Sequence, residues 1–190
     1  MCGSGTVAIE AALIASNRRP GLFRNNYGFM HVQGYNEEFY LKEDALLETQ
    51  IDDSIRPRII ATDFSERAIE NAKKNAIAAG VADMIDFSVC DFADTEVPLE
   101  GKGVVFLNPE YGERLGEVKD LELTYKRIGD FFKQRCGGYY GYVFTGNLEL
   151  AKKTGLKAGR RIEFYTSTID CRLLEYELYE GSRRKEKGQE

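Results

Sequence analysis

Several residue types that build common catalytic and metal sites are scarce in this chain. It contains no tryptophan and a single histidine, His31, which argues against a histidine-based catalytic triad and against a metal site with several histidine ligands. The four cysteines are scattered, without the paired spacing of a zinc site or a redox motif. We therefore expect no metal, and we expect reduced thiols at Cys2, Cys90, Cys136 and Cys171.

The sequence also lacks any segment that would direct it to a membrane. No apolar run approaches the ~20 residues that a membrane-spanning helix needs. The N-terminus has no charged region followed by an apolar one, which is the pattern of a signal peptide. We therefore predict a cytoplasmic protein that makes no membrane contact.

An excess of positive charge is missing as well. The 190 residues include 26 basic and 31 acidic side chains, a formal net charge of −5. This sign is wrong for a domain that grips a nucleic-acid backbone unaided. A basic run, Arg183-Arg184-Lys185 with Lys187, lies near the C-terminus, where such a run is usually only solvated.

The chain does contain a regular alternation of short apolar runs and helical stripes. Together with a closing pair of antiparallel strands, this alternation predicts one α/β domain over residues 1–180 with a mainly parallel sheet and a C-terminal antiparallel hairpin, followed by a charged tail at 181–190. The expected helices cover residues 6–14, 37–51, 65–79, 113–136 and 148–156, and the expected strands cover 59–62, 85–89, 103–107, 140–145, 162–167 and 173–179.

A glycine loop opens the chain. Gly3, Gly5 and Ala8 match the pattern G-x-G-x-x-[GA], in which the small residues allow a tight turn and a close approach of the backbone to a ligand. The helix that follows is so apolar that we expect it to be buried all round. A strand should precede such a loop, so the chain is expected to begin just downstream of it.

Polar residues follow three of the expected strands. Asp63, Asp91 and Asn108 each come where a strand ends, at the edge where an open α/β sheet binds its ligands. Asp63 suits the two hydroxyls of a ribose and Asp91 suits an adenine amine, while Phe64 and Phe92 could form walls for the ring. An aspartate after a strand is often only a turn residue. Three such residues and a glycine loop together predict an adenosine-containing cofactor.

The segment after the third strand offers a second set of polar groups. Asn108 has a side-chain carbonyl oxygen, Pro109 has a backbone carbonyl, and Tyr111 has an aromatic face. Two acceptors beside a stacking ring suit a flat heterocycle that carries an exocyclic amine. The alternative is that Asn-Pro only forms a turn after the strand.

A nicotinamide dinucleotide is the first rival cofactor because the glycine pattern also fits it. In that fold the acidic residue comes about 20 residues after the glycines. Asp63 comes 58 residues after Gly5, and the dinucleotide interpretation gives no role to Asn-Pro-x-Tyr. We therefore favour a different adenosine-containing cofactor.

The whole chain resembles a known family. Residues 108–115, Asn-Pro-Glu-Tyr-Gly-Glu-Arg-Leu, are similar to the Asn-Pro-Pro-Tyr-Gly-Glu-Arg-Leu motif of S-adenosylmethionine-dependent amino-methyltransferases. Residues 1–13 resemble the cofactor loop of that family, residues 61–76 its ribose-binding strand and helix, and residues 90–92 its adenine position. The match looks closest to the THUMP-containing guanine-N2 methyltransferases of large-subunit ribosomal RNA.

The resemblance implies a Rossmann-like methyltransferase fold with seven strands, of which the last is reversed. It also implies that Asn108 and the carbonyl of Pro109 hold the guanine amine while Tyr111 stacks on the base. The substrate would be ribosomal RNA, gripped through a separate N-terminal RNA-binding domain that this chain lacks. The cofactor, S-adenosylmethionine, would be bound by Cys2, Gly3, Gly5, Thr6, Asp63, Phe64, Asp91, Phe92 and Asn108.

One residue departs from the motif of the family. Glu110 stands where the family has a second proline, and it adds a backbone N–H and a negative charge beside the reacting atoms. Glu110 is therefore a candidate catalytic residue that could accept the released proton. Two alternatives stay open: a non-catalytic binding module, and a methyltransferase acting on adenine N6 or another planar amine.

Overall fold

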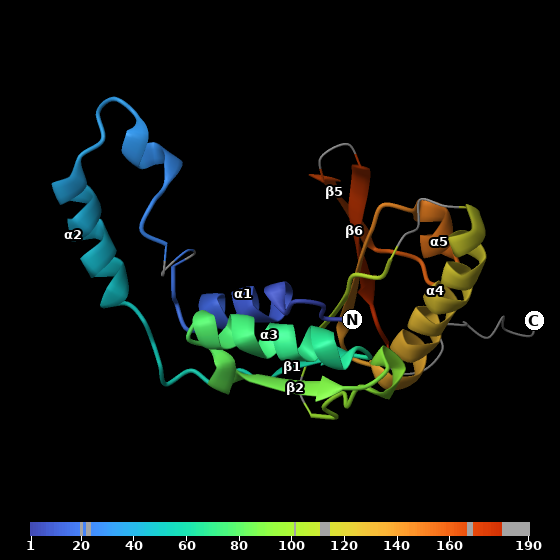
Figure 1. The fold of residues 1–190 in the computed structure, drawn as a ribbon. Coiled ribbons are helices and arrows are strands. Elements are labelled where there is room, and N and C mark those ends of the chain that lie inside the picture. Colours follow the sequence, from blue (N-terminus) through green and yellow to red (C-terminus); the bar gives the residue numbers. More distant parts are fainter. Residues whose placement is uncertain (20, 22–23, 101, 111–114, 167–168, 180–190) are drawn as a thin grey trace, which may run out of the picture. The chain divides into compact units, whose positions relative to one another are not determined.

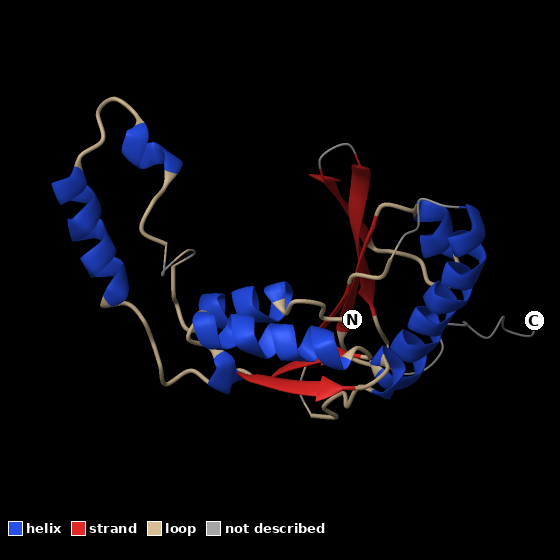
Figure 2. Ribbon diagram, viewed as in Figure 1, coloured by secondary structure: helices blue, strands red, loops and turns tan. Residues whose placement is uncertain are grey.

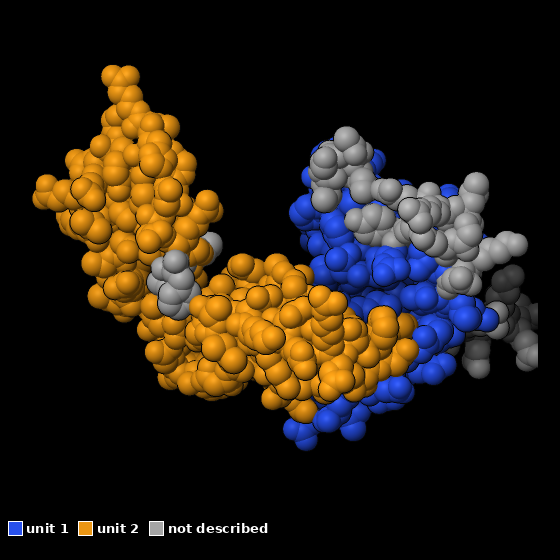
Figure 3. All heavy atoms as spheres, in the orientation of Figure 1, with its two compact units in different colours: residues 1, 93–190 blue, residues 2–92 orange. Residues whose placement is uncertain are grey.

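The structure is a computed structural model that describes residues 1–19, 21, 24–100, 102–110, 115–166 and 169–179. The chain divides into two compact units, coloured separately in Figure 3. Unit 2 comprises residues 2–92, and unit 1 comprises residues 93–190 together with Met1. The predicted boundary between domain and tail, at residue 181, lies outside the described residues.

Unit 2 alternates helices and strands, as the sequence predicts. Its elements are α1 (Thr6–Ala15), α2 (Glu37–Glu48), β1 (Ile59–Asp63), α3 (Glu66–Ala78) and β2 (Ile85–Val89). Short 3₁₀ helices cover Gly28–His31, Ala82–Met84 and Phe92–Asp94.

Strands β1 and β2 pair in parallel, with Ile59 opposite Ile85 and Asp63 opposite Val89. Helices α1 and α3 lie side by side against this pair (Figure 1). The core between helices and strands is aliphatic and consists of Ile9, Ala12, Leu13, Ala61, Ala76, Val81, Met84 and Ile85.

The expectation that α1 is buried all round is wrong. Ile9, Ala12 and Leu13 are buried, but Val7 is 50% exposed and Ile14 is 75% exposed. The reason is that α3 and the strands β1 and β2 cover only one stripe of α1.

The ends of α3 follow from local chemistry. The side chain of Ser65 accepts a hydrogen bond from the backbone N–H of Ala68, which confirms the predicted N-cap. Gly80, with a φ of +69°, follows the end of the helix in the left-handed region that favours glycine.

The segment between α1 and β1 contains α2, whose N-cap Asn36 accepts a hydrogen bond from the backbone N–H of Phe39. The helix ends at Glu48, three residues before the predicted end, and none of its residues is buried. Aromatic rings near it contact one another, including Tyr27 and Phe29, which stack with ring centroids 5.2 Å apart.

Unit 1 contains a four-stranded mixed sheet and two helices. The elements are β3 (Val104–Leu107), α4 (Leu115–Arg135), β4 (Tyr140–Thr145), α5 (Leu148–Lys152), β5 (Arg160–Thr166) and β6 (Ile169–Glu177). The strand order is β3-β4-β6-β5, with β3 parallel to β4 and β6 antiparallel to both of its neighbours.

The predicted reversed last strand is thus confirmed, and so is the α/β class. The described residues form six strands in two sheets, whereas the resemblance implied seven strands in one. Figure 2 shows α4 and α5 together on one side of the unit 1 sheet. Helix α4 packs through Phe132, whose ring lies 6.0 Å from that of Tyr176 and close to Gly141, where a side chain would collide with it.

Candidate cofactor and catalytic site

The glycine loop is fastened to β1 and α3 by three hydrogen bonds. The backbone N–H of Cys2 donates to the carbonyl of Thr62 at 2.9 Å, and the backbone N–H of Gly3 donates to the Asp63 carboxylate at 3.0 Å. From α3, the side-chain amide of Asn75 donates to the carbonyl of Ser4 at 2.9 Å. The loop is therefore held in one conformation by its own unit.

The two glycines of the loop serve different purposes. Gly3 has a φ of +56°, and a Cβ placed on it would meet no atom within 4 Å, so its backbone is open to a ligand. Gly5 has a φ of +82°, and a Cβ placed on it would lie 2.9 Å from the Cβ of Ala72. Gly5 thus allows the close packing of α1 against α3, while Gly3 leaves room beside the loop.

Asp63 connects the loop to the start of α3. Its side chain accepts from the backbone N–H of Gly3 through one oxygen and from that of Ser65 through the other, each at 3.0 Å. The residue is only 7% exposed. A carboxylate has about four acceptor positions, so these two bonds are compatible with the predicted contact to ribose hydroxyls.

The two predicted aromatic walls differ in exposure. Phe64 is 78% exposed, whereas Phe92 is 5% exposed. An aromatic ring stacks on a planar group through an open face, so Phe64 is the better placed of the two. Asp91 is half-buried and Thr6 is exposed, its hydroxyl lying 3.1 Å from that of Ser4.

Cys2 lies at the base of the loop and is half-buried. Burial, and to a smaller extent the negative charge of Asp63, raises the pKa of its thiol. The neutral thiol is therefore favoured at physiological pH.

The predicted amine-binding residues belong to unit 1. Leu107, the last residue of β3, is buried, and Asn108 and Glu110 are exposed on either side of the buried Pro109. Tyr111 lies outside the described residues. The predicted cofactor residues from Cys2 to Phe92 therefore belong to unit 2, whereas Asn108, which was predicted to contact both cofactor and amine, belongs to unit 1 with Pro109 and Glu110.

Two residues of the loop's support, Asn75 and Ser4, were not among the predicted site residues. Asparagine is a poor helix former because its side chain competes with backbone hydrogen bonds. Its presence inside α3, three residues before the end of the helix, was the available signal, but only the fold shows that it reaches a carbonyl 71 residues away.

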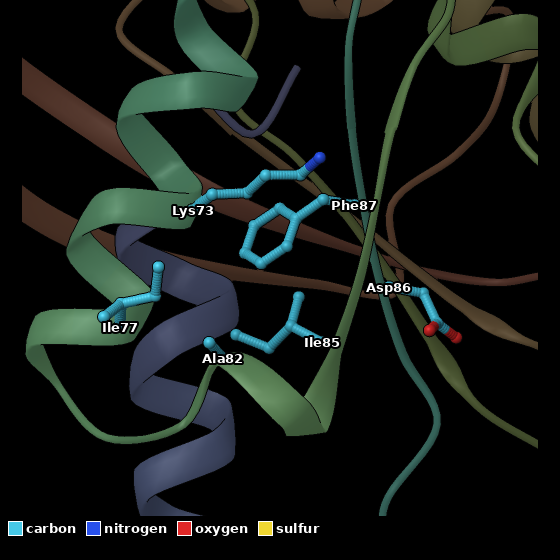
Figure 4. A pocket seen from close by; sticks show the side chains of 6 residues that line it. All are labelled: Lys73, Ile77, Ala82, Ile85, Asp86 and Phe87. Carbon is cyan, nitrogen blue, oxygen red and sulfur yellow. The ribbon is translucent and has the colours of Figure 1, made fainter.

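Two hollows on the surface of the described residues lie elsewhere. A pocket of about 310 Å³ between α3 and β2 is lined by Lys73, Ile77 and Phe87 among others, and Figure 4 shows Asp86 pointing to the opposite side of β2 from Phe87. A second, of about 550 Å³, lies between α2 and the segment before it, where Arg19 pairs with Asp44. Neither pocket includes a predicted site residue.

None of the helices in the described part of the chain combines the length and apolar character that crossing a membrane requires. Within the same residues, no three His, Cys, Asp or Glu side chains are grouped so that they could hold a metal ion.

Comparison with known proteins assigns most of the chain to a family. The family described as "RMKL-like, methyltransferase domain" matches residues 1–175. The chain belongs to this methyltransferase family. Its α/β fold is accordingly the Rossmann-like methyltransferase fold that the sequence predicts.

Curated relatives agree with this family. The chain is 36% identical over 188 residues to the "Ribosomal RNA large subunit methyltransferase K/L" of Shewanella amazonensis, and 38% identical over 185 residues to the protein of the same name from Syntrophotalea carbinolica. These matches cover 97% and 95% of this chain but only 26% of each relative. The chain therefore spans about a quarter of the length of these relatives.

Solved structures share the fold. SMU.472, described as a putative methyltransferase complexed with SAH, has a TM-score of 0.83 and 29% identity, covering 97% of this chain and 48% of that one. A "possible methylase" from Clostridium difficile 630 has a TM-score of 0.85, 28% identity and coverages of 96% and 48%. A "predicted N6-adenine-specific DNA methylase" from Listeria monocytogenes has a TM-score of 0.79 and 31% identity, covering 93% of this chain and 44% of that one. The bound SAH in SMU.472 agrees with the cofactor class predicted for this chain.

Proposed function

We propose that this chain transfers a methyl group from S-adenosylmethionine to an exocyclic amine, and that this amine is N2 of a guanine in large-subunit ribosomal RNA. The observation that carries the proposal is the glycine loop, with an open Gly3 fastened by Asp63, in a member of a methyltransferase family. The names of the curated relatives support ribosomal RNA as the substrate.

The residues of unit 2 fit an adenosine-containing cofactor. The open space at Gly3 admits a ligand to the backbone, and the exposed ring of Phe64 follows the carboxylate of Asp63. In our proposal Asp63 accepts from the ribose hydroxyls, Asp91 accepts from the adenine amine, and Phe64 stacks on the ring. Cys2, Gly5, Thr6 and Phe92 complete the site through backbone and packing contacts. When bound, S-adenosylmethionine supplies an electrophilic methyl group on its sulfonium.

The residues after β3 are proposed to prepare the amine. The side-chain oxygen of Asn108 and the carbonyl of Pro109 accept its two hydrogens, and Tyr111 stacks on the base. The lone pair of a guanine amine is delocalised into the ring, so accepting both hydrogens favours the pyramidal, nucleophilic form. Positioning and electrostatics then provide the rate enhancement without a strong general base. The base would leave its helix to reach these groups.

Glu110 has two possible effects in this proposal. Its exposed carboxylate can accept the proton that the amine releases, and its charge favours a nearby sulfonium. In contrast, the loss of the second proline frees φ and can displace Tyr111, and a shift of about 1 Å costs ~10²-fold in rate. We propose that the first effect prevails.

We also propose a cytoplasmic location, where ribosomal RNA would be met. RNA-binding regions outside these residues, such as the THUMP domain that the resemblance implies, are proposed to share the contact with RNA. They would offset the net charge of −5.

The test is incubation of large-subunit ribosomal RNA with the chain and methyl-labelled S-adenosylmethionine, followed by digestion to nucleosides. Label in N2-methylguanosine supports the proposal. Label in N6-methyladenosine would favour the second candidate, suggested by the likeness to the Listeria methylase.

Calorimetric titration of S-adenosylmethionine separates an enzyme from a non-catalytic binding module. The proposal predicts binding that depends on Asp63. An absence of binding, in the same preparation and in one extended by the strand expected before the loop, would show that the chain is not an enzyme of this kind.

A further inference from the structure

The positive charge of this acidic chain is concentrated in one part of unit 1. Residues 124–161 contain nine basic and only two acidic side chains, although the whole chain has 26 and 31. All nine basic residues are exposed. This stretch of unit 1 is therefore strongly cationic, although the chain as a whole is acidic.

The topology of unit 1 brings most of these cations to one edge of the sheet. Helix α4 ends at Arg135, shortly before β4 begins, and α5 ends at Lys152, shortly before β5 begins. Strands β4 and β5 are both antiparallel to β6, so both begin at the same edge. We call Lys133, Arg135, Lys157, Arg160 and Arg161 at this edge the basic edge.

Contacts within unit 1 hold the basic edge together. The Lys133 ammonium on α4 donates to the carbonyl of Thr154 at 2.9 Å, which joins the end of α4 to the segment that carries Lys157. Glu149 and Glu122 are paired with other lysines, Lys152 at 2.6 Å and Lys153 at 3.0 Å. At the same end of the sheet, β6 places Glu175 opposite Arg160 and Glu177 opposite Tyr140, so the five cations of the basic edge face two carboxylates and keep a net positive charge.

A purely structural role explains only part of this arrangement. Cations in the last turn of a helix interact favourably with the helix dipole, which accounts for Lys133 and Arg135 on α4. Lys157 lies between elements, and Arg160 and Arg161 begin a strand, so this explanation does not extend to them. The carboxylate of Glu175 lies 3.8 Å from the Arg160 guanidinium, and both side chains belong to the described part of the chain.

We infer that the basic edge binds the phosphate backbone of the RNA substrate. Exposed, clustered lysines and arginines are the usual means of neutralising phosphates. Asn108 follows β3, which is parallel to β4, so the catalytic motif lies at the opposite edge of the same sheet. The two edges are separated by the six residues of β4, about 20 Å at ~3.3 Å per residue. The basic edge therefore grips RNA that flanks the target nucleotide.

This inference rests on the proposed RNA substrate, but its test does not depend on methyl transfer. Two triple variants are compared. The unit 1 triple carries Arg135→Gln, Lys157→Gln and Arg161→Gln. The unit 2 triple carries Lys42→Gln, Lys73→Gln and Lys74→Gln, which removes the same charge from exposed positions of unit 2. Binding of a fluorescein-labelled RNA stem–loop is measured by anisotropy over a range of salt concentrations, without cofactor. Circular dichroism verifies that both variants are folded.

The wild-type chain should bind the RNA with a strong salt dependence. For the unit 1 triple, the slope of log K against log salt should become shallower by about 2–3, since each phosphate contact contributes ~0.7–0.9. The unit 2 triple should keep the wild-type slope. Equal slopes in all three proteins, equal losses in both triples, or no RNA binding by the wild type would overturn the inference.

Anionic vesicles of phosphatidylglycerol in phosphatidylcholine provide the last arm of the test. Little binding is expected there. Vesicle binding that only the unit 1 triple abolishes, with the RNA slope unchanged, would assign the basic edge to a lipid surface and contradict the inference. A failure of methyl transfer alone would instead contradict the proposed function and leave the RNA-binding result standing.

Discussion

The carboxylate of Asp63 accepts a hydrogen bond from the backbone N–H of Gly3 at 3.0 Å, across 60 residues of sequence. The same carboxylate also accepts from the backbone N–H of Ser65. Asp63 thus orders the glycine loop and the start of α3 before any ligand arrives. Any substitution that removes the Asp63 carboxylate is therefore expected to change both the stability of unit 2 and the binding of a cofactor.

Asp63→Ala should lower both the stability of unit 2 and the affinity for S-adenosylmethionine. Removing the carboxylate leaves two backbone donors without their partner, which costs about 1–3 kcal/mol. Asp63→Asn keeps one acceptor oxygen and should lose less of both quantities. Urea unfolding and calorimetric titration measure them, and an unchanged affinity in Asp63→Ala would show that Asp63 does not support the cofactor site.

The two glycines of the loop provide a matched pair of substitutions. Gly5→Ala should destabilise the protein by about 1–3 kcal/mol, because the new Cβ collides with Ala72 at a left-handed φ. Gly3→Ala meets no atom within 4 Å, so its cost in stability should be smaller and its main effect should be weaker cofactor binding. Thermal unfolding and calorimetry distinguish the two, and the opposite order of effects would contradict the assigned roles.

Cys136 gives the protein a pH-dependent stability on the alkaline side. Burial raises the pKa of its thiol from 9.0 to about 12 in the folded protein. The unfolded chain therefore loses its proton first, and the free energy of unfolding should fall as the pH rises from about 9 to about 12, by at most about 1.4 kcal/mol per pH unit. Urea unfolding at several alkaline pH values should show a shallower fall in Cys136→Ala. If the free energy of unfolding fell with pH equally steeply in both proteins, Cys136 would not be the source of the alkaline instability.

Much of the fold was predictable because local and long-range preferences agree. The strand Tyr140–Thr145 was predicted with its observed bounds, and Ser65 was predicted as the N-cap of α3. The predicted helix 148–156 ends earlier, at Lys152, because Gly155 adopts a left-handed φ of +63°. Strand β5 begins two residues before its predicted start, because Arg160 pairs across the ladder with Glu175, which an apolar pattern does not reveal.

The candidate site was predictable only as a set of residue types. The sequence identified Gly3 and Asp63 separately, but their hydrogen bond depends on the pairing of distant segments. Phe64 and Phe92 have the same local sequence context, because each follows an aspartate after a strand. The sequence therefore could not show that Phe64 is exposed and Phe92 is buried, which depends on the packing of distant segments. For the contact of Asn75 with Ser4, the sequence offered only an asparagine inside a predicted helix, which does not identify its partner.

Glu110→Pro restores the motif of the family and tests the exposed carboxylate. If Glu110 accepts the released proton, as proposed, the variant should turn over more slowly while its affinity for S-adenosylmethionine stays unchanged. Glu110→Gln, which keeps the backbone N–H and removes the charge, should show the same fall. Unchanged or faster turnover in Glu110→Pro would mean that Glu110 is only a tolerated substitute.

The most direct test of the central claim compares the wild-type chain with Asn108→Ala in single-turnover methylation of large-subunit ribosomal RNA, with mass-spectrometric analysis of the nucleosides. The account predicts N2-methylguanosine from the wild type. It also predicts a rate lower by about 10²-fold in Asn108→Ala, with the affinity for S-adenosylmethionine retained, because the variant loses an acceptor that positions the amine. Equal rates in the two proteins, or N6-methyladenosine as the product, would contradict it.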